Sequence, residues 1–265
     1  MEFQMSDWCQ DRVNILGVKV SAITIRDALI AIEERLGDRK PFYICVTGVH
    51  GVMECQRDAS LRVIHNASGL TVPDGMPMVW MSHWLGFPKV ERVYGPDLML
   101  ATTELSAKRG YRNFYYGGAP GTADRLATVL GAKCPGLEIV GTISPPFRPL
   151  TPEEDDEIVA KINAARPDIV WVGLSTPRQE RWMAPHAGRL TAPVLAGVGA
   201  AFDFLSGNKS QAPRWMQRHG LEWLFRMAKE PRRLAKRYVT NNPVFVYRAL
   251  GQLLSPERFP QTRSS

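Results

Sequence analysis

One carboxylate of the sequence is placed where proton transfer is chemically reasonable. Asp74 lies in the turn of TVPDGMP, directly after a short apolar run that predicts a strand. A Pro-Asp-Gly sequence is ordinarily a surface turn, but the chain has few other isolated carboxylates in such loops, and an aspartate there is able to act as a general base. Thr47 ends another apolar run, PFYICVT, where its hydroxyl either donates a hydrogen bond to a ligand or only closes the strand.

Two further polar side chains have a functional and a structural interpretation. Arg92, in ERVYGPDL, carries a planar guanidinium that suits phosphate oxygens, or it is a surface arginine paired with Glu91 or another neighbour. Gln179, in DIVWVGLSTPRQERWM, follows a predicted strand and is able to reach a ligand. However, Thr176, Pro177 and Gln179 also fit the N-cap, first and third positions of a capping box. The sequence leaves these alternatives open.

Glycines gather between a predicted strand and a predicted helix in NFYYGGAPGTADRLATVL. Gly117, Gly118 and Gly121 lack a Cβ, so the backbone is able to approach a ligand closely. The start of the following helix offers unpaired N–H groups to phosphate. The alternative is a tight turn without a ligand, because GGxPG is neither a Walker nor a dinucleotide fingerprint.

A second glycine loop, GVGAAFDF, begins like the dinucleotide fingerprint G-x-G-x-x-G. Phe202 stands where the third glycine belongs, which counts against an oxidoreductase that binds a nicotinamide or flavin cofactor. Gly197 and Gly199 are still able to approach a nucleotide. Asp203 either caps a helix or contacts a ribose.

The sequence favours chemistry without a metal or a cofactor. No D-x-D pair follows a predicted strand, and no HExxH or other cluster of histidines and carboxylates has metal-ligand spacing. The acidic run over residues 153–157 follows Thr151-Pro152 and is typical of a helix start. The five histidines have no visible Ser or Cys partner for nucleophilic catalysis. Four cysteines without CxxC spacing predict neither a disulfide framework nor a structural zinc site.

Short apolar runs alternate with amphipathic stretches over residues 1–205, which predicts an α/β domain. We expect a Rossmann-like, mostly parallel sheet flanked by helices, with its ligands beyond the carboxyl ends of the strands. The predicted strands are VNILGVKV, PFYICVT, GLTVP, NFYYGG, LEIVGTI, DIVWVGL and APVLAGVG. The predicted helices cover residues 25–36, 51–66, 97–108, 121–133, 151–165 and 177–190.

Residues 206–265 differ from this body in pattern and charge. After the linker-like SGNKSQAP, Gly220 and Pro231 divide a tryptophan-bearing helical region into three short pieces. Residues 212–237 hold eight basic side chains and two glutamates, while the rest of the 265-residue chain is nearly neutral. A basic amphipathic helical appendage of this kind suits anionic lipid headgroups. The alternatives are a solvated face or a nucleic-acid patch.

The ends of the chain carry no signal for export or insertion. The longest apolar runs fall well short of the about 20 residues that cross a bilayer. The start MEFQMSDWCQDR lacks the basic-then-apolar order of a secretory signal. We therefore expect the protein in the cytosol or on the cytoplasmic face of the membrane.

Taken in order along the chain, these motifs resemble the WecG/TagA/CpsF family of bacterial glycosyltransferases. The resemblance rests on VNILGV, VPDGMPMVW, ERVYGPDL, FYYGGAPGTAD, PDIVWVGLSTPRQERWM, GVGAAFDFLSG and APRWMQRHGLEWLFRMAKEPRRLAKRY. The last three stretches are long and specific.

The resemblance implies transfer of a hexose, often of the N-acetylmannosamine type, from a UDP-sugar donor to a polyprenyl-diphosphate-linked sugar. The reaction would invert the anomeric centre without a metal, at the cytoplasmic face of the inner membrane. Asp74 matches the family's proposed base, Thr47 an active-site threonine, Arg92 an arginine on the diphosphate side, and Gln179 the glutamine of TP(R/K)QE.

The resemblance also assigns a role to the C-terminal arginines. They match an appendage that engages the membrane and covers the active site, and the family resemblance suggests self-association. The predicted membrane or lid residues are Arg214, Arg218, Arg226, Arg232 and Arg233.

One departure concerns the sugar rather than the reaction class. Many family members carry Asn two residues after the threonine, whereas this chain has Val49, followed by His50. The runner-up hypothesis is a non-enzymatic nucleotide- or nucleic-acid-binding module, and an oxidoreductase comes third.

Overall fold

The computed structural model describes residues 11–263, which form two compact units. Unit 1 contains residues 11–28, Val46–Tyr94 and residues 211–263. Unit 2 contains Leu29–Cys45 and Gly95–Ser210. The assignment of residues 1–205 to catalysis and 206–265 to membrane association stays a prediction about what each part does.

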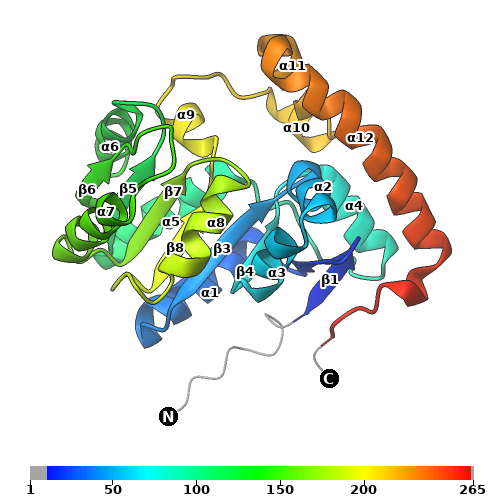
Figure 1. Ribbon diagram of the computed structural model, residues 1–265, viewed down its shortest axis with the longest axis horizontal. Coiled ribbons are helices and arrows are strands. Elements are labelled where there is room, and N and C mark those ends of the chain that lie inside the picture. The colour runs from blue at the N-terminus through cyan, green and yellow to red at the C-terminus, as the bar shows by residue number, and fades with distance from the viewer. Residues whose placement is uncertain (1–10, 264–265) are drawn as a thin grey trace. The chain divides into compact units, whose positions relative to one another are not determined.

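Parallel strands make up the sheet, as the alternating pattern predicted (Figure 1). The sheet order is β4-β3-β8-β7-β5-β6, and the registers of β3 with β8, β8 with β7, β7 with β5 and β5 with β6 are all parallel. The strands are β3 (Phe42–Thr47), β4 (Leu70–Pro73), β5 (Arg112–Gly117), β6 (Glu138–Ile143), β7 (Ile169–Gly173) and β8 (Val194–Gly197). The predicted α/β class with a mostly parallel sheet is confirmed.

Helices alternate with these strands. They are α1 (Ile25–Asp38), α5 (Gly95–Arg109), α6 (Thr122–Lys133), α7 (Pro152–Ala164), α8 (Arg178–His186) and α9 (Ala201–Leu205). The central strands are apolar on both faces because helices cover both sides of a parallel sheet. Trp171 of β7 is fully buried, and its indole N–H donates to Asn113 Oδ1 at 2.9 Å.

Unit 1 begins with a hairpin where the sequence predicted one strand. VNILGVKV is divided into β1 (Arg12–Ile15) and β2 (Val18–Ser21), which pair antiparallel. Leu16 and Gly17 form the turn with φ of 51° and 84°. Two left-handed residues in succession reverse the chain with the twist that a two-residue hairpin needs.

The other elements of unit 1 are helical. They are α2 (Val49–Arg57), α3 (Ala59–Ala67), α4 (Met76–Trp84), α10 (Arg214–Arg218), α11 (Glu222–Lys229), α12 (Pro231–Leu254) and the 3-10 helix η2 (Pro256–Arg258). The single helix predicted over 51–66 is wrong, because Asp58 accepts hydrogen bonds from the N–H groups of Ser60 and Leu61 and starts a second helix there.

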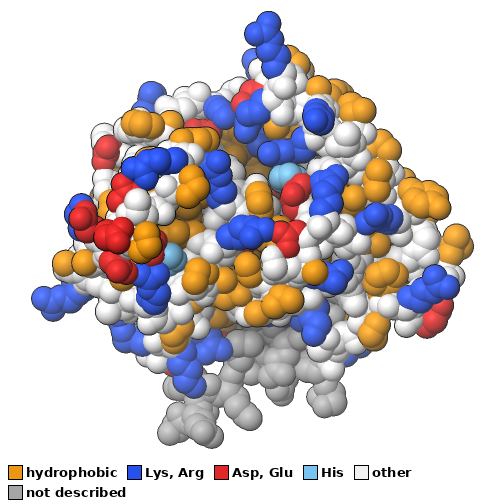
Figure 2. Space-filling view, viewed as in Figure 1, with side chains coloured by type: hydrophobic (Ala, Val, Ile, Leu, Met, Phe, Trp, Pro, Cys, Tyr) orange, Lys and Arg blue, Asp and Glu red, His pale blue; other side chains and the backbone are white. Residues whose placement is uncertain are grey.

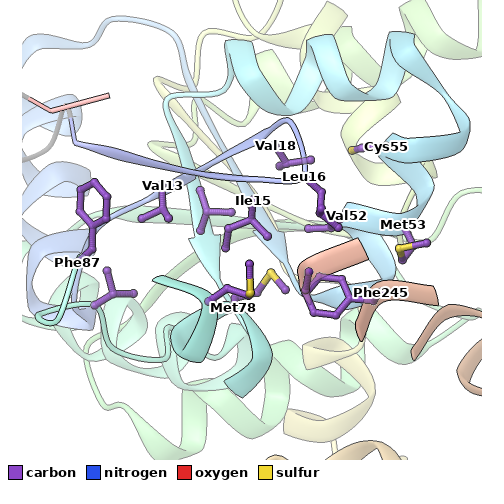
Figure 3. Close-up of a cluster of buried hydrophobic side chains, with 14 of the residues drawn as sticks. Val13, Ile15, Leu16, Val18, Val52, Met53, Cys55, Met78, Phe87 and Phe245 are labelled. Atoms are coloured by element: carbon purple, nitrogen blue, oxygen red, sulfur yellow. The ribbon is translucent and has the colours of Figure 1, made fainter. Parts of the chain in front are cut away.

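The core of unit 1 includes the C-terminal helix (Figure 3). Val13 and Ile15 of the hairpin, Met78 of α4 and Phe245 of α12 belong to one buried apolar cluster. The prediction of three short helical pieces is therefore wrong for the third piece. Helix α12 has 24 residues and contributes to the core as well as to the surface. Among residues 11–263, no helix is both long enough and apolar enough to cross a membrane.

Cys45, Cys55 and Cys134 are buried thiols that form no disulfide, and Cys9 lies outside the described residues.

Candidate active site

Thr47 and Asp74 come together in unit 1 because Thr47 ends β3 and Asp74 directly follows β4. The backbone N–H of Asp74 donates to the carbonyl of Thr47 at 3.0 Å. Gly48 lies beneath the aspartate side chain, since a Cβ on Gly48 would be 3.9 Å from Asp74 Oδ2. The carboxylate is half-buried. Its main chain is thus fixed, and its side chain lies at a strand end, where a general base is expected.

The hydroxyl of Thr47 is buried and makes no hydrogen bond to residues 11–263. The residue is 1% exposed, and within the described chain its Oγ1 has no hydrogen-bond partner. Its methyl group packs so closely on α2 that a Cβ at Gly51 would be 2.9 Å from Cγ2. A buried hydroxyl without a partner costs stability. The hydrogen-bonding capacity of this hydroxyl is thus unused by the residues that the structure describes.

Arg92 is held by an anion that is distant in sequence. Its Nη2 donates to Glu222 Oε2 of α11 at 2.5 Å, and its Nε donates to the carbonyl of Asp74. The guanidinium carbon lies 4.1 Å from the centre of the Tyr94 ring. The side chain is only 15% exposed. Arg92 is therefore not a surface arginine paired with Glu91.

Tyr94 and Arg226 complete a cluster around Glu222, which we call the Glu222 cluster: Arg92, Tyr94, Glu222 and Arg226. The Tyr94 hydroxyl donates to Glu222 Oε1 at 3.3 Å, and Arg226 Nη1 lies 3.9 Å from the same oxygen. Glu222 and Arg226 side chains are 13% and 24% exposed. Burial and the nearby charges of Glu222 and Asp74 raise the pKa of Tyr94, so it remains a neutral hydrogen-bond donor.

The two arginines of this cluster stay charged. Burial alone would lower the pKa of each guanidinium, but nearby acidic groups outweigh it. Asp74 and Glu222 raise the pKa of Arg92, while Tyr238 and Glu222 are the main groups that raise that of Arg226. Sequence reasoning missed Tyr94 and Glu222. The only local signal was that each lies within a motif, ERVYGPDL or GLEWLF.

Of the predicted membrane or lid arginines, Arg226 joins the cluster. Arg214, Arg218 and Arg232 are exposed. Arg233 binds Glu230 through hydrogen bonds of 2.6 and 2.8 Å. The appendage therefore presents some of its cations to solvent and turns at least one inward.

Of the two alternatives at the start of α8, the capping box is not formed. Pro177 is the N-cap, and no side chain caps it. The Thr176 hydroxyl instead donates to Glu180 Oε1 at 2.8 Å, one turn along the helix. The peptide bond before Pro177 is cis. The local order Thr-Pro-x-Gln fits a capping box, but the hydroxyl is taken by a buried carboxylate.

Gln179 packs on the second glycine loop, in unit 2. Its Nε2 donates to the Gly197 carbonyl at 3.0 Å, and the side chain is 2% exposed. A Cβ on Gly197 would be 3.1 Å from Nε2, and one on Gly199 would be 3.2 Å from Oε1. That Oε1 has no hydrogen-bond partner in the described residues. Both glycines therefore make room for the amide, whose oxygen is available to a donor.

Two glycines of the first loop are required by protein packing. A Cβ on Gly117 would be 2.6 Å from the Gly173 backbone, and one on Gly118 would be 2.8 Å from Thr122. Phe202 then covers the strand end, since a Cβ on Gly173 would be 2.7 Å from its ring. Phe202 therefore fills the space above the strand end with protein.

Gly121 differs from these two. It is the N-cap of α6 in a left-handed conformation, with φ of 78°, and a Cβ there would meet no atom within 4 Å. Of the three glycines predicted to approach a ligand in the first loop, Gly121 is the one at a helix start with open space beside it.

The structure is a parallel α/β fold with polar side chains at and after its strand ends, and comparison with known proteins supplies the class of protein. The model described as "Glycosyl transferase WecG/TagA/CpsF family" matches residues 13–259. The chain belongs to this family, which confirms the resemblance seen in its motifs, and it is a hexosyltransferase.

Three curated relatives share the name N-acetylglucosaminyldiphosphoundecaprenol N-acetyl-beta-D-mannosaminyltransferase. The protein of Bacillus spizizenii W23 is 27% identical over 198 residues, which is 75% of each chain. That of Bacillus subtilis 168 is 30% identical over 176 residues, 66% of each chain. That of Staphylococcus aureus MW2 is 26% identical over 193 residues, 72% of each chain.

Proposed function

We propose that this protein transfers a hexose of the N-acetylmannosamine type, or a related hexose, from a UDP donor to a polyprenyl-diphosphate-linked sugar in the synthesis of an exopolysaccharide or other cell-surface polymer. The names of the relatives support the acceptor and the sugar class. The observation that carries the proposal is the backbone hydrogen bond between Asp74 and Thr47, with the Arg92 guanidinium bonded to the Asp74 carbonyl. It unites a carboxylate, a buried hydroxyl and a cation in unit 1.

Asp74 is the general base of this proposal. Its carboxylate takes the proton of the acceptor hydroxyl as that oxygen forms a bond to the anomeric carbon. The bond between the anomeric carbon and the diphosphate oxygen breaks on the opposite face, and its electron pair leaves with UDP. One carboxylate suffices for this single displacement, which inverts the anomeric centre.

Cations and neutral donors of the chain stabilise the leaving diphosphate in place of a metal. Arg92 offers a guanidinium, whose planar donors match phosphate oxygens. In unit 2, Gln179 with Gly197 and Gly199, Thr176, and the loop of Gly117, Gly118 and Gly121 are assigned to the donor nucleotide. The buried Oε1 of Gln179 is the acceptor that supports this assignment.

The surface of the C-terminal helices supports peripheral binding to the anionic cytoplasmic face of the membrane. Exposed apolar side chains recur along one stripe of α12 at helical spacing. They are Val239, Val246, Tyr247, Leu250 and Leu254, each at least 55% exposed. In Figure 2, hydrophobic and basic side chains alternate along the edge where Figure 1 places α12. An apolar stripe beside arginines suits a lipid surface better than a nucleic-acid backbone.

The decisive experiment is a screen of UDP-sugars for release of UDP in the presence of a polyprenyl-diphosphate-linked N-acetylglucosamine. Transfer with a UDP-N-acetylmannosamine-type donor, with EDTA present, is the expected result. If no UDP-sugar is turned over, or if turnover requires an added divalent cation, the corresponding part of the proposal is wrong.

A further inference from the structure

In the Glu222 cluster, a carboxylate occupies the arginine donors that the proposed reaction needs for the diphosphate of its donor. Glu222 accepts from Arg92 at 2.5 Å and from the Tyr94 hydroxyl at 3.3 Å, and Arg226 lies 3.9 Å away. All three charged side chains are less than one quarter exposed. A guanidinium with so little access to water needs a counter-anion, and Glu222 supplies it.

The donors that hold this carboxylate are those that hold phosphate oxygens. Arginine binds both groups through the same planar N–H fork, and a phenol donates to either. A diphosphate carries more negative charge than one carboxylate and offers more acceptor oxygens. Two anions do not share such donors readily, because each raises the energy of the other's charged form.

The surrounding helices add positive charge that Glu222 does not balance. Arg237 of α12 is half-buried, and its pKa is lowered by burial and by the like charges of Arg233 and Arg226. Arg226, Arg233 and Arg237 therefore repel one another beside the Glu222 cluster, although Glu230 binds Arg233 and Asp74 also acts on the cluster. An incoming anion with two or more charges relieves this repulsion better than Glu222 does.

We propose that Glu222 is a displaceable internal counter-anion of the diphosphate site, and that Tyr94 is a further donor that passes from this carboxylate to a diphosphate oxygen. This inference rests on the proposed function, because it assumes that the diphosphate of a UDP-sugar takes the place of the Glu222 carboxylate. Glu222 is a positioning residue: it keeps Arg92 and Arg226 in place in the empty enzyme and competes with the substrate for them.

The test compares wild type with Glu222→Gln by calorimetric titration with UDP and with inorganic pyrophosphate. Glutamine keeps the shape and one acceptor oxygen, removes the competing charge, and puts an NH2 group where the second oxygen accepted a hydrogen bond. We expect the Kd of Glu222→Gln to fall about tenfold for both ligands, which corresponds to about 1.4 kcal/mol. Glu91→Gln, which removes an exposed charge next to Arg92, should leave both Kd values within twofold.

A purely structural ion pair gives the opposite result. In that case Glu222→Gln loosens the arginines, and Kd and the KM for the donor both rise. On our proposal KM for the donor falls, while kcat falls too because UDP leaves more slowly. Tyr94→Phe should weaken pyrophosphate binding in the Glu222→Gln background, where the phenol has no carboxylate to bind.

Thermal melting separates a folding defect from the inference. We expect Glu222→Gln to melt below wild type without ligand and to gain more in Tm than wild type at saturating pyrophosphate. Equal gains, or unchanged or weaker binding by Glu222→Gln, would overturn the role of Glu222. Failure of wild type itself to bind UDP would instead overturn the proposed function on which this inference rests.

Discussion

The N–H of Asp74 donates to the carbonyl of Thr47 at 3.0 Å, so the residues that follow β4 and end β3 are fixed to each other through the backbone. This bond does not depend on either side chain. Substitutions of the Asp74 carboxylate and the Thr47 hydroxyl therefore remove the reactive groups with little change in the main chain.

Replacing Asp74 with Asn should abolish most turnover and leave UDP binding within about threefold of wild type. The amide has the size of the carboxylate but cannot take the proton from the hydroxyl of the sugar acceptor. Loss of a general base lowers kcat by about 10²- to 10⁴-fold. UDP release under saturating substrates measures kcat, and titration with UDP measures binding. Glu257→Gln, an exposed charge change in η2, serves as control. Near-normal transfer by Asp74→Asn would refute the base assignment.

Replacing Thr47 with Val should lower transfer at least tenfold while the protein remains as stable as wild type or becomes more stable. Valine has nearly the shape of threonine, and it removes a buried hydroxyl that has no partner in the described chain. Thr47→Ser, which keeps the hydroxyl, should retain activity. Urea unfolding and UDP release distinguish the roles: a threonine that only closes the strand predicts normal transfer by Thr47→Val.

Two glycine-to-alanine substitutions should have opposite effects on stability. Gly117→Ala places a Cβ 2.6 Å from the Gly173 backbone at φ of 134°, so we expect a loss of about 3 kcal/mol or more. Gly131→Ala, inside α6 and 3.7 Å from Ile139, should gain about 0.5–1 kcal/mol. Chemical denaturation of both variants provides the measurement. If Gly117→Ala has the same free energy of unfolding as wild type, the backbone at this strand end shifts at little cost, and the packing argument is wrong.

Removing charge from the exposed appendage arginines should weaken membrane binding. For Arg214→Gln, Arg218→Gln and Arg232→Gln together, we expect about a 100-fold loss of affinity for phosphatidylglycerol vesicles, at about 1 kcal/mol for each charge. Lys19→Gln, Lys89→Gln and Lys108→Gln together remove as many exposed charges elsewhere. Truncation after Gly207 is a poorer test, because it removes Phe245 from the core of unit 1. Equal cosedimentation of the two triple variants would end the membrane assignment of these arginines.

Stability should fall with rising pH above about 10 partly because of Tyr94. Burial raises the pKa of its phenol above the ordinary value of 10.0. The unfolded chain then loses a proton that the folded chain keeps, so the free energy of unfolding falls by about 1.4 kcal/mol for each pH unit. Tyr94→Phe removes this contribution and should give a shallower slope between pH 10 and 11 in urea titrations. Parallel slopes for the two proteins would contradict the burial argument.

Local patterns predicted the sheet because they depend on neighbouring residues. Apolar runs with intervening amphipathic stretches gave the strands from β3 to β8 and the helices α5, α6, α7 and α8, whereas α4 was not predicted. Breaks within these patterns were harder to predict. The turn at Leu16-Gly17 and the new helix at Asp58 depend on backbone conformation and capping, which override an unbroken apolar pattern.

The appendage shows the same limit. Its basic charge and tryptophans were evident from composition, but the length of α12 and its place in the core were not. Periodicity places Phe245 and Leu250 on a helix and leaves open what each one faces. Packing decided that the first is 4% exposed and the second 56%.

By itself the sequence determined the fold class, the family and the loops that carry Thr47, Asp74, Arg92 and Gln179, because motifs and strand ends are local. Only the tertiary structure decided that Arg92 meets Glu222, 130 positions later, and that Gly117 and Gly118 are glycines for the sake of packing. The partner of an ion pair, and the space around a glycine, depend on which segments the fold brings within a few ångströms of each other. The spacing of residues along the chain does not give these distances.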